Sequence, residues 1–263
     1  MFPGINIFGK FVGSYMIMAA IGVIVAGSVA MLRYKKRAGS SYPILETILF
    51  SAIGIVVGGC FLYGLTRLDY WHFMFEAGDF MGFINAFVGV FGGSVFYGGL
   101  IGGMISAGIA IKAKKYPADL ITDVAAPSVA LFHAFGRIGC FLGGCCYGIE
   151  SDFGFVFTHS LNESANGVRR LPVQLFESGF EFILFAVLSI LLRKEKLKGR
   201  LFSLYLVLYG IFRFIIEYFR GDTYRGFIFG ISTSQFISIF VVLGASVYLT
   251  LRTAKEKHEL DNA

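Results

Sequence analysis

The chain has 263 residues, of which 56% are hydrophobic, 17% are aromatic and only 15% are charged. Soluble domains carry about 25% charged residues, so this composition excludes a disordered chain, a nucleic-acid-binding protein and an ordinary soluble globule. It leaves a polytopic membrane protein, in which the net charge of +6 reports on orientation rather than on an acidic partner.

The first apolar run extends from Phe11 to Leu32. It is long enough to cross a bilayer, which takes about 20 residues. The residues before it contain a single lysine, and no small-residue cleavage site of the signal-peptide type ends it. We therefore expect this run to be a retained first span.

Six further apolar runs are long enough to be spans, and they cover Ile44–Leu65, Val95–Ile111, Leu120–Leu142, Val173–Leu192, Leu201–Phe219 and Ser232–Leu251. The stretch Phe80–Gly93 is apolar but short and rich in glycine, so we expect it to lie at the interface or to re-enter. The sequence thus predicts an all-α polytopic membrane protein of about seven transmembrane helices, forming a single integral-membrane domain over residues 1–263.

The basic residues predict the orientation of these spans. Of the 23 lysines and arginines, fifteen follow the first, third, fifth and seventh spans, six lie in the N-terminus and the other connections, and two lie inside spans. Because basic residues favour the cytoplasmic side, we expect the N-terminus outside and the C-terminus in the cytoplasm. The longest polar connection, residues 143–171, then lies outside, where we expect it to form a small cap.

Several ionisable residues fall inside the predicted spans, where charge is costly and usually faces a cavity or another charge. Arg137 lies in the fourth span, Arg213 and Glu217 lie in the sixth, and Glu177 and Glu181 begin the fifth. One interpretation is a set of buried ion pairs that fix helix packing. The other is an anion site, because the planar fork of arginine donors suits phosphate, and a phospholipid headgroup is the anion available at that depth.

Helical spacing groups these residues on two faces. His133 and Arg137 are four residues apart and share one face, while the other face carries Tyr209, Arg213, Glu217 and Arg220. We therefore expect a basic site near the outer leaflet, partly neutralised by Glu217.

Two glycine-rich segments, Tyr97–Gly103 and Gly136–Gly148, have two interpretations. Small residues allow close packing of membrane helices, and they also allow a backbone to bend or to approach a ligand. Gly143 and Gly144, near the end of a span, favour a break there.

The four cysteines are interpreted separately. Cys60 is expected to be a packing residue, whereas Cys140, Cys145 and Cys146 lie toward the outer side, where disulfides form. Cys140 could close a short loop with either neighbour, or one of the three could be a reactive thiol. A metal site lacks a convincing second pair of ligands, so neither a metal nor a cofactor is expected.

Four ordered segments resemble motifs of the prolipoprotein diacylglyceryl transferase family. They are YGGLIGG from Tyr97, DVAAPSVALFHAFGRIGCFLGGCCYG from Asp123, LPVQLFES from Leu171 and YGIFRFIIEYFRGD from Tyr209. The resemblance implies a bacterial cytoplasmic-membrane transferase with its active site toward the outer leaflet. That family moves the diacylglyceryl group of phosphatidylglycerol onto a cysteine thiol of a lipoprotein precursor, which gives a thioether and glycerol phosphate.

The resemblance also implies roles for individual residues. Arg137 and Arg213 match the family's essential arginines and are catalytic candidates together with His133 and Tyr97. The substrate-binding candidates are Gly98, Gly99, Cys140, Cys145, Gly148, Gln174, Glu177, Tyr209, Glu217 and Arg220.

The chain departs from the family in its signature segments. Tyr97 replaces the histidine that is the family's expected base, while Cys140 replaces an asparagine and Cys145 a glutamate. Tyrosine is a poor base at pH 7, so we hypothesise that His133 takes that role. The expected partners are phosphatidylglycerol, membrane lipids and a lipoprotein signal peptide, with no nucleic acid. Transfer to a different membrane acceptor and a non-enzymatic lipid-binding or transport role are the alternatives.

Overall fold

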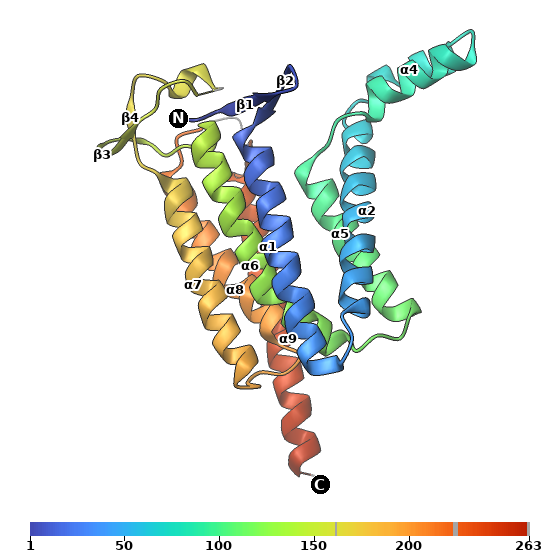
Figure 1. The fold of residues 1–263 in the computed structure, drawn as a ribbon, viewed down its shortest axis with the longest axis vertical. Coiled ribbons are helices and arrows are strands. Elements are labelled where there is room, and N and C mark those ends of the chain that lie inside the picture. Colours follow the sequence, from blue (N-terminus) through green and yellow to red (C-terminus); the bar gives the residue numbers. More distant parts are fainter. Residues whose placement is uncertain (161, 223–225, 262–263) are drawn as a thin grey trace. The chain divides into compact units, whose positions relative to one another are not determined.

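The computed structural model describes residues 1–160, 162–222 and 226–261, and it is mainly helical (Figure 1). The chain divides into two compact units, one formed by residues 1–33 and 122–263 and the other by residues 34–121. The prediction of an all-α polytopic membrane protein is confirmed. The expectation of a single integral-membrane domain stays a prediction.

The first unit is a bundle of long helices. Its helices are α1 (Ser14–Ala38, as far as Arg33), α6 (Ala118–Gly143, from Thr122), α7 (Val173–Arg193), α8 (Leu201–Ile216) with the 3-10 turn η3 (Glu217–Phe219), and α9 (Thr233–Asp261). Glycines let α1 approach α6: a Cβ on Gly22 would lie 3.0 Å from Phe135 Cβ, and one on Gly139 would lie 3.0 Å from Tyr15 Cα. Figure 1 shows α1 in blue running beside α6 in green.

Short antiparallel strand pairs precede α1 and lie in the connections before α7 and α9. They pair β1 (Gly4–Ile7) with β2 (Lys10–Gly13), β3 (Glu150–Val156) with β4 (Arg169–Arg170), and β5 (Phe227–Ile228) with β6 (Ile231–Ser232). The prediction that the first span begins at Phe11 is therefore wrong by three residues. Phe8 and Gly9 both have positive φ and turn the chain, so the apolar residues up to Gly13 pair as a strand before α1 begins.

The connection predicted to form a cap has folded structure of its own. Besides β3 and β4 it contains the 3-10 turn η2 (Glu163–Ala165). Tyr147, Phe157 and Ala165 form a small buried cluster, against which Met1 and Phe141 pack. Its position outside the membrane stays a prediction.

The second unit contains α2 (Tyr42–Leu65), η1 (Leu68–Tyr70), α3 (His72–Phe75), α4 (Phe80–Phe91) and α5 (Phe96–Ala113). Glycines bring α2 and α5 together: a Cβ on Gly98 would lie 2.3 Å from the Gly58 carbonyl oxygen, and one on Gly102 would lie 2.2 Å from that of Gly54. Spaced four residues apart on both helices, these glycines form a close-packing interface. Within the segment Tyr97–Gly103, Gly98 and Gly102 therefore serve close helix packing, the first of the two interpretations.

Six of the predicted spans coincide with helices that are long and apolar enough to cross a membrane. The seventh, predicted at residues 95–111, is the shorter apolar helix α5. With 18 residues it rises about 27 Å, close to the hydrocarbon thickness of about 30 Å. The stretch Phe80–Gly93, which was not counted as a span, is the short helix α4.

Candidate active site

An ion-pair network joins α6, α7 and α8 inside the first unit. Glu177, which is only 1% exposed, places one carboxylate oxygen 2.8 Å from Arg137 Nε and the other 2.8 Å from Arg213 Nη1. Arg213 also reaches Glu217 Oε2 at 2.7 Å and donates to Ser234 Oγ at 3.0 Å. The two buried arginines therefore share one carboxylate, which brings three helices to a single point.

This arrangement is less basic than expected from the sequence, which offered Glu217 alone as the neutralising group. Glu177 neutralises both arginines because α7 begins at Val173, which places residue 177 one turn inside the helix and level with them. The expected ion pairs are thus present, with Glu177 holding both guanidinium groups in position, and the anion site stays a prediction.

The expectation that Arg220 shares a helix face with Arg213 and Glu217 is wrong. Helix α8 ends at Ile216, η3 tightens the next turn, and Arg220 follows in an extended conformation. Arg220 instead donates to both carboxylate oxygens of Asp222, from Nε at 2.9 Å and from Nη2 at 2.6 Å.

His133 is held between two charged residues. Its Nδ1 lies 2.6 Å from Glu181 Oε1, and its Nε2 accepts a hydrogen bond from Arg137 Nε at 3.2 Å. Tyr205 OH donates to the same Glu181 oxygen at 3.4 Å, and the ring of Tyr209 packs edge-on against that of His133, with centroids 4.9 Å apart. As a hydrogen-bond acceptor, Nε2 is the ring nitrogen that could take up a proton.

The two arginines differ in the use of their donors. Arg213 commits Nη1 to Glu177 and Nη2 to both Glu217 and Ser234. Arg137 uses Nε for its hydrogen bond to His133 and for its shortest contact with Glu177, and its two Nη groups donate no hydrogen bond to any residue that the structure describes. The Arg137 side chain is 13% exposed, so its outer end is within reach of a ligand.

The turn after α6 adds a group of thiols to this end of the bundle. The helix ends at Gly143 and Gly144 has φ of +76°, so the predicted break at these glycines is confirmed. The Sγ atoms of Cys140, Cys145 and Cys146 all lie within 4.8 Å of one another. All three are free thiols in this structure, so the disulfide considered from the sequence is not formed.

Neighbouring groups lower the pKa of one of these thiols and hydrogen-bond the backbone around them. The Cys140 and Cys145 thiols, with the charges of Arg220 and Arg137, lower the pKa of the Cys146 thiol. Gln174 Nε2 donates to the Cys145 carbonyl oxygen at 2.7 Å.

Gly148 pairs with Arg220 in an isolated antiparallel bridge. A Cβ on Gly148 would lie 2.5 Å from the Leu171 carbonyl oxygen, so this position has no room for a side chain. Its glycine is therefore required by the fold of the segment that leads into α7.

Three predicted site residues belong to the other unit. Tyr97, Gly98 and Gly99 begin α5, where the backbone of Gly98 packs on Gly58 and that of Gly99 on Ile55. Their predicted roles beside the arginines stay predictions.

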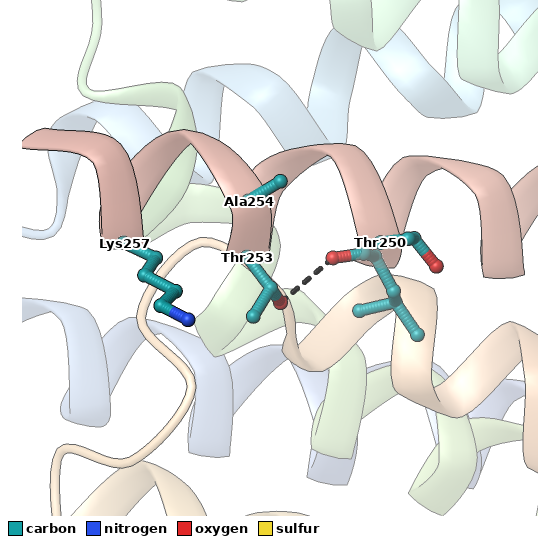
Figure 2. Close-up of a pocket in the computed structure, with 5 residues that line it drawn as sticks. Thr250, Thr253, Ala254 and Lys257 are labelled. Carbon is teal, nitrogen blue, oxygen red and sulfur yellow. Dashed lines mark hydrogen bonds between the residues drawn. The ribbon is translucent and has the colours of Figure 1, made fainter.

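A separate hollow on α9 contains none of these groups (Figure 2). Four of its five lining residues are uncharged: Leu249, Thr250, Thr253 and Ala254, with Lys257 the fifth. Thr253 Oγ1 donates to the Leu249 carbonyl oxygen at 2.8 Å, the dashed line in Figure 2. Thr250 Oγ1 donates to the Ser246 carbonyl oxygen at 3.0 Å, so both hydroxyls of this hollow are bonded inside their own helix and it offers little chemistry.

Sequence reasoning assigned no place in the site to four residues that lie beside its side chains. They are Glu181, noted only as an ionisable residue in a span, Cys146, noted only as a possible thiol, and Asp222 and Ser234. Glu181 lies in the same span as Glu177 and four residues after it, so helical spacing alone could have placed the two carboxylates on one face. Asp222 ends the motif segment that begins at Tyr209, and Ser234 lies outside the motif segments; the fold brings each of them to an arginine.

Comparisons with known proteins agree on one family. A family model described as prolipoprotein diacylglyceryl transferase matches residues 5–251. The chain is 36% identical to the phosphatidylglycerol–prolipoprotein diacylglyceryl transferase of Clostridium tetani, over 95% of the chain and 98% of that protein. It is 34% identical to the corresponding protein 2 of Clostridium perfringens (97% and 96% covered) and to that of Campylobacter hominis (94% and 89% covered).

Proposed function

The chain belongs to the prolipoprotein diacylglyceryl transferase family, and on that premise we propose that it transfers the diacylglyceryl group of phosphatidylglycerol to a cysteine thiol of a lipoprotein precursor. It is a multi-pass membrane enzyme, and it covers nearly the whole length of relatives that are named for this reaction. The residues that carry out the reaction follow from the geometry of the first unit.

The pair of Nη groups on Arg137, which donate no hydrogen bond to the described residues, is the observation that carries the proposal. Glu177 and His133 fix the guanidinium through Nε, so its outer edge presents two parallel donors in a fixed direction. A phosphodiester oxygen pair fits such a fork in a bidentate way. Arg137 is therefore the residue that binds the phosphate of phosphatidylglycerol.

The same contact assists the chemical step. The thiolate sulfur attacks the glyceryl carbon, the bond from that carbon to the phosphate oxygen breaks, and the electron pair remains on glycerol phosphate. The leaving group gains a second negative charge, which a preorganised cation stabilises. Arg213 acts differently: its donors are committed to Glu177, Glu217 and Ser234, so it is a positioning residue that holds Glu177 against Arg137.

His133 is the proposed proton acceptor for the incoming thiol. Glu181 Oε1 lies 2.6 Å from Nδ1 and would stabilise the imidazolium that forms when Nε2 takes a proton. For this transfer Arg137 must release its hydrogen bond to Nε2 while it keeps its ion pair with Glu177.

The site is proposed to open toward the outer leaflet of the bacterial cytoplasmic membrane. Arg137 lies near the C-terminal end of α6, Arg213 near that of α8, and Glu177 near the N-terminal end of α7, so all three share one end of the bundle. The basic connection Arg193–Arg200 lies at the other end of α7 and α8, the side that positive charges assign to the cytoplasm.

One incubation tests this function. Purified protein is mixed with phosphatidylglycerol labelled in its acyl chains and with a lipoprotein signal peptide that carries either cysteine or serine at the acceptor position. Label on the cysteine peptide alone supports the proposal. Lipid consumed without labelled peptide would identify a different acceptor, and no consumption would contradict an enzymatic role.

A further inference from the structure

Cys140, Cys145 and Cys146 form a compact cluster of three thiols. Each Sγ lies within 4.8 Å of the other two, and the side chains are buried or half-buried. Two thiols would suffice for a disulfide; three mutually adjacent thiols are an arrangement that a thiophilic metal ion can bind.

The backbone is shaped to hold this cluster. The Cys145 N–H donates to the Cys140 carbonyl oxygen at 3.1 Å, which folds the chain back onto the end of α6 after Gly144. Cys146 has φ of +60°, a conformation uncommon for a residue other than glycine, and this directs its side chain within reach of the other two thiols. Gln174 then fixes the Cys145 carbonyl oxygen at 2.7 Å. A local strain that is overdetermined by its surroundings is typical of a functional site.

The spacing suits zinc. Three thiolates bound to Zn²⁺ at about 2.3 Å lie roughly 3.8–4.0 Å from one another, so shifts of less than about 1 Å bring these sulfurs into place. Three protein ligands leave the fourth position of the ion open, as catalytic zinc sites do. The cationic side chains of Arg137 and Arg220 act on this cluster and offset the charge that three thiolates bring.

We propose that Cys140, Cys145 and Cys146 bind a thiophilic divalent cation of the Zn²⁺ class, whose fourth ligand is the acceptor cysteine of the lipoprotein precursor. This inference rests on the proposed function. It adds a metal to a site for which the sequence predicted none, because the spacing of the cysteines along the chain does not show that the turn after α6 brings them together.

A bound cation would favour deprotonation of the acceptor thiol. Tyr97 occupies the position of the family's expected base and is a weak one at neutral pH. A thiol bound to the cation loses its proton, which passes to His133 in the proposed function, and the metal-bound thiolate remains a nucleophile. Its sulfur then forms the bond to the glyceryl carbon as the carbon–oxygen bond to the phosphate breaks. Glycerol phosphate leaves with the electron pair, and the thioether product, a weaker ligand, dissociates from the ion.

The test uses the full chain in detergent, reduced and stripped with a chelator, and Co²⁺ as a spectroscopic probe that Zn²⁺ then displaces. We expect one ion per chain and the near-ultraviolet absorption of cobalt–thiolate bonds. The variant C140S/C145S/C146S loses both signals, while Cys60→Ser, which changes a cysteine of the other unit, keeps them. A signal peptide with the acceptor cysteine changes the cobalt spectrum, and the serine peptide does not.

The activity arm needs no substitution, so a failure of the triple variant to fold does not affect it. Chelation should lower the rate of label transfer at least tenfold, and Zn²⁺ should restore it. Absence of stoichiometric binding by the reduced protein, or a disulfide that persists under reduction, would overturn the metal site. A full transfer rate after chelation would overturn its role with the thiol and leave the proposed function standing. Metal binding that responds to the cysteine peptide without any transfer would support the site and contradict the proposed function.

Discussion

Replacing Arg137 by lysine separates a bidentate phosphate site from a simple positive charge. Arg137 holds Glu177 Oε2 at 2.8 Å and His133 Nε2 at 3.2 Å through Nε, which leaves both Nη groups for the substrate. A lysine keeps the charge but has one ammonium group, and the buried Glu177 carboxylate captures it. The phosphate then loses its two donors.

The expected effect is large. Removing one preorganised donor from an oxyanion site lowers rates by about 10²–10³, which corresponds to about 2.7–4 kcal/mol. We therefore expect Arg137→Lys to lower kcat/KM for transfer from phosphatidylglycerol by about 100-fold to 1000-fold, with most of the loss in kcat, because the second charge on the leaving group exists only in the transition state. The assay is the initial rate of label transfer to the cysteine peptide.

Arg200→Lys is the matched control. The Arg200 side chain is also 13% exposed and also ion-paired, with Nη2 at 2.8 Å from Glu256 and Nη1 donating to Thr253 at 3.0 Å, but it lies in the connection before α8, outside the network. Its rate should stay within about twofold of the unchanged protein, since pairs of this kind contribute about 1 kcal/mol or less. Equal rates for the two variants would refute the reasoning about the Nη groups.

Three further outcomes follow from the same contacts. Glu177→Gln leaves two buried guanidinium groups without their shared carboxylate, so it should lower the unfolding free energy by about 3–5 kcal/mol, seen as a lower thermal midpoint in detergent; an unchanged midpoint would mean that the network is not structural. His133→Ala should slow transfer by about 10²–10⁴, while Glu181→Gln, which keeps a hydrogen-bond acceptor for the ring, should lose less; full activity of the alanine variant would exclude His133 as the base. Gly98→Ala places a Cβ 2.3 Å from a facing carbonyl and should lower the thermal midpoint, whereas Gly108→Ala in open space on the same helix should not; equal midpoints would argue against the glycine interface.

The amino-acid sequence predicted the helices well because membrane spans depend on a one-dimensional property, a run of about 20 apolar residues. The ends of the helices were harder to predict from the sequence. The distribution of polar and apolar residues near Gly13 and Ile216 does not mark where the helices begin and end. It therefore does not show that a strand precedes α1 or that a 3-10 turn follows α8. The second of these changes moves Arg220 away from the face on which helical spacing had placed it.

The candidate site was predicted as a set of residues but not as an arrangement. The cost of charge in a membrane identified Arg137 and Arg213 without any structure. That Glu177 joins both of them depends on how α7 packs between α6 and α8, which no spacing along one helix encodes. The cluster at Cys140 and Cys145 likewise depends on a turn, because five residues apart on a continuous helix these side chains would diverge.

The most direct test of the account measures two products in one incubation of the protein, phosphatidylglycerol and the cysteine peptide: thioether formed and glycerol phosphate released. If Arg137 stabilises a departing glycerol phosphate while a thiolate attacks the glyceryl carbon, the two amounts are equal at every time point and both disappear with the serine peptide. Thioether without an equal amount of glycerol phosphate, or glycerol phosphate released at the same rate with the serine peptide, would contradict the account.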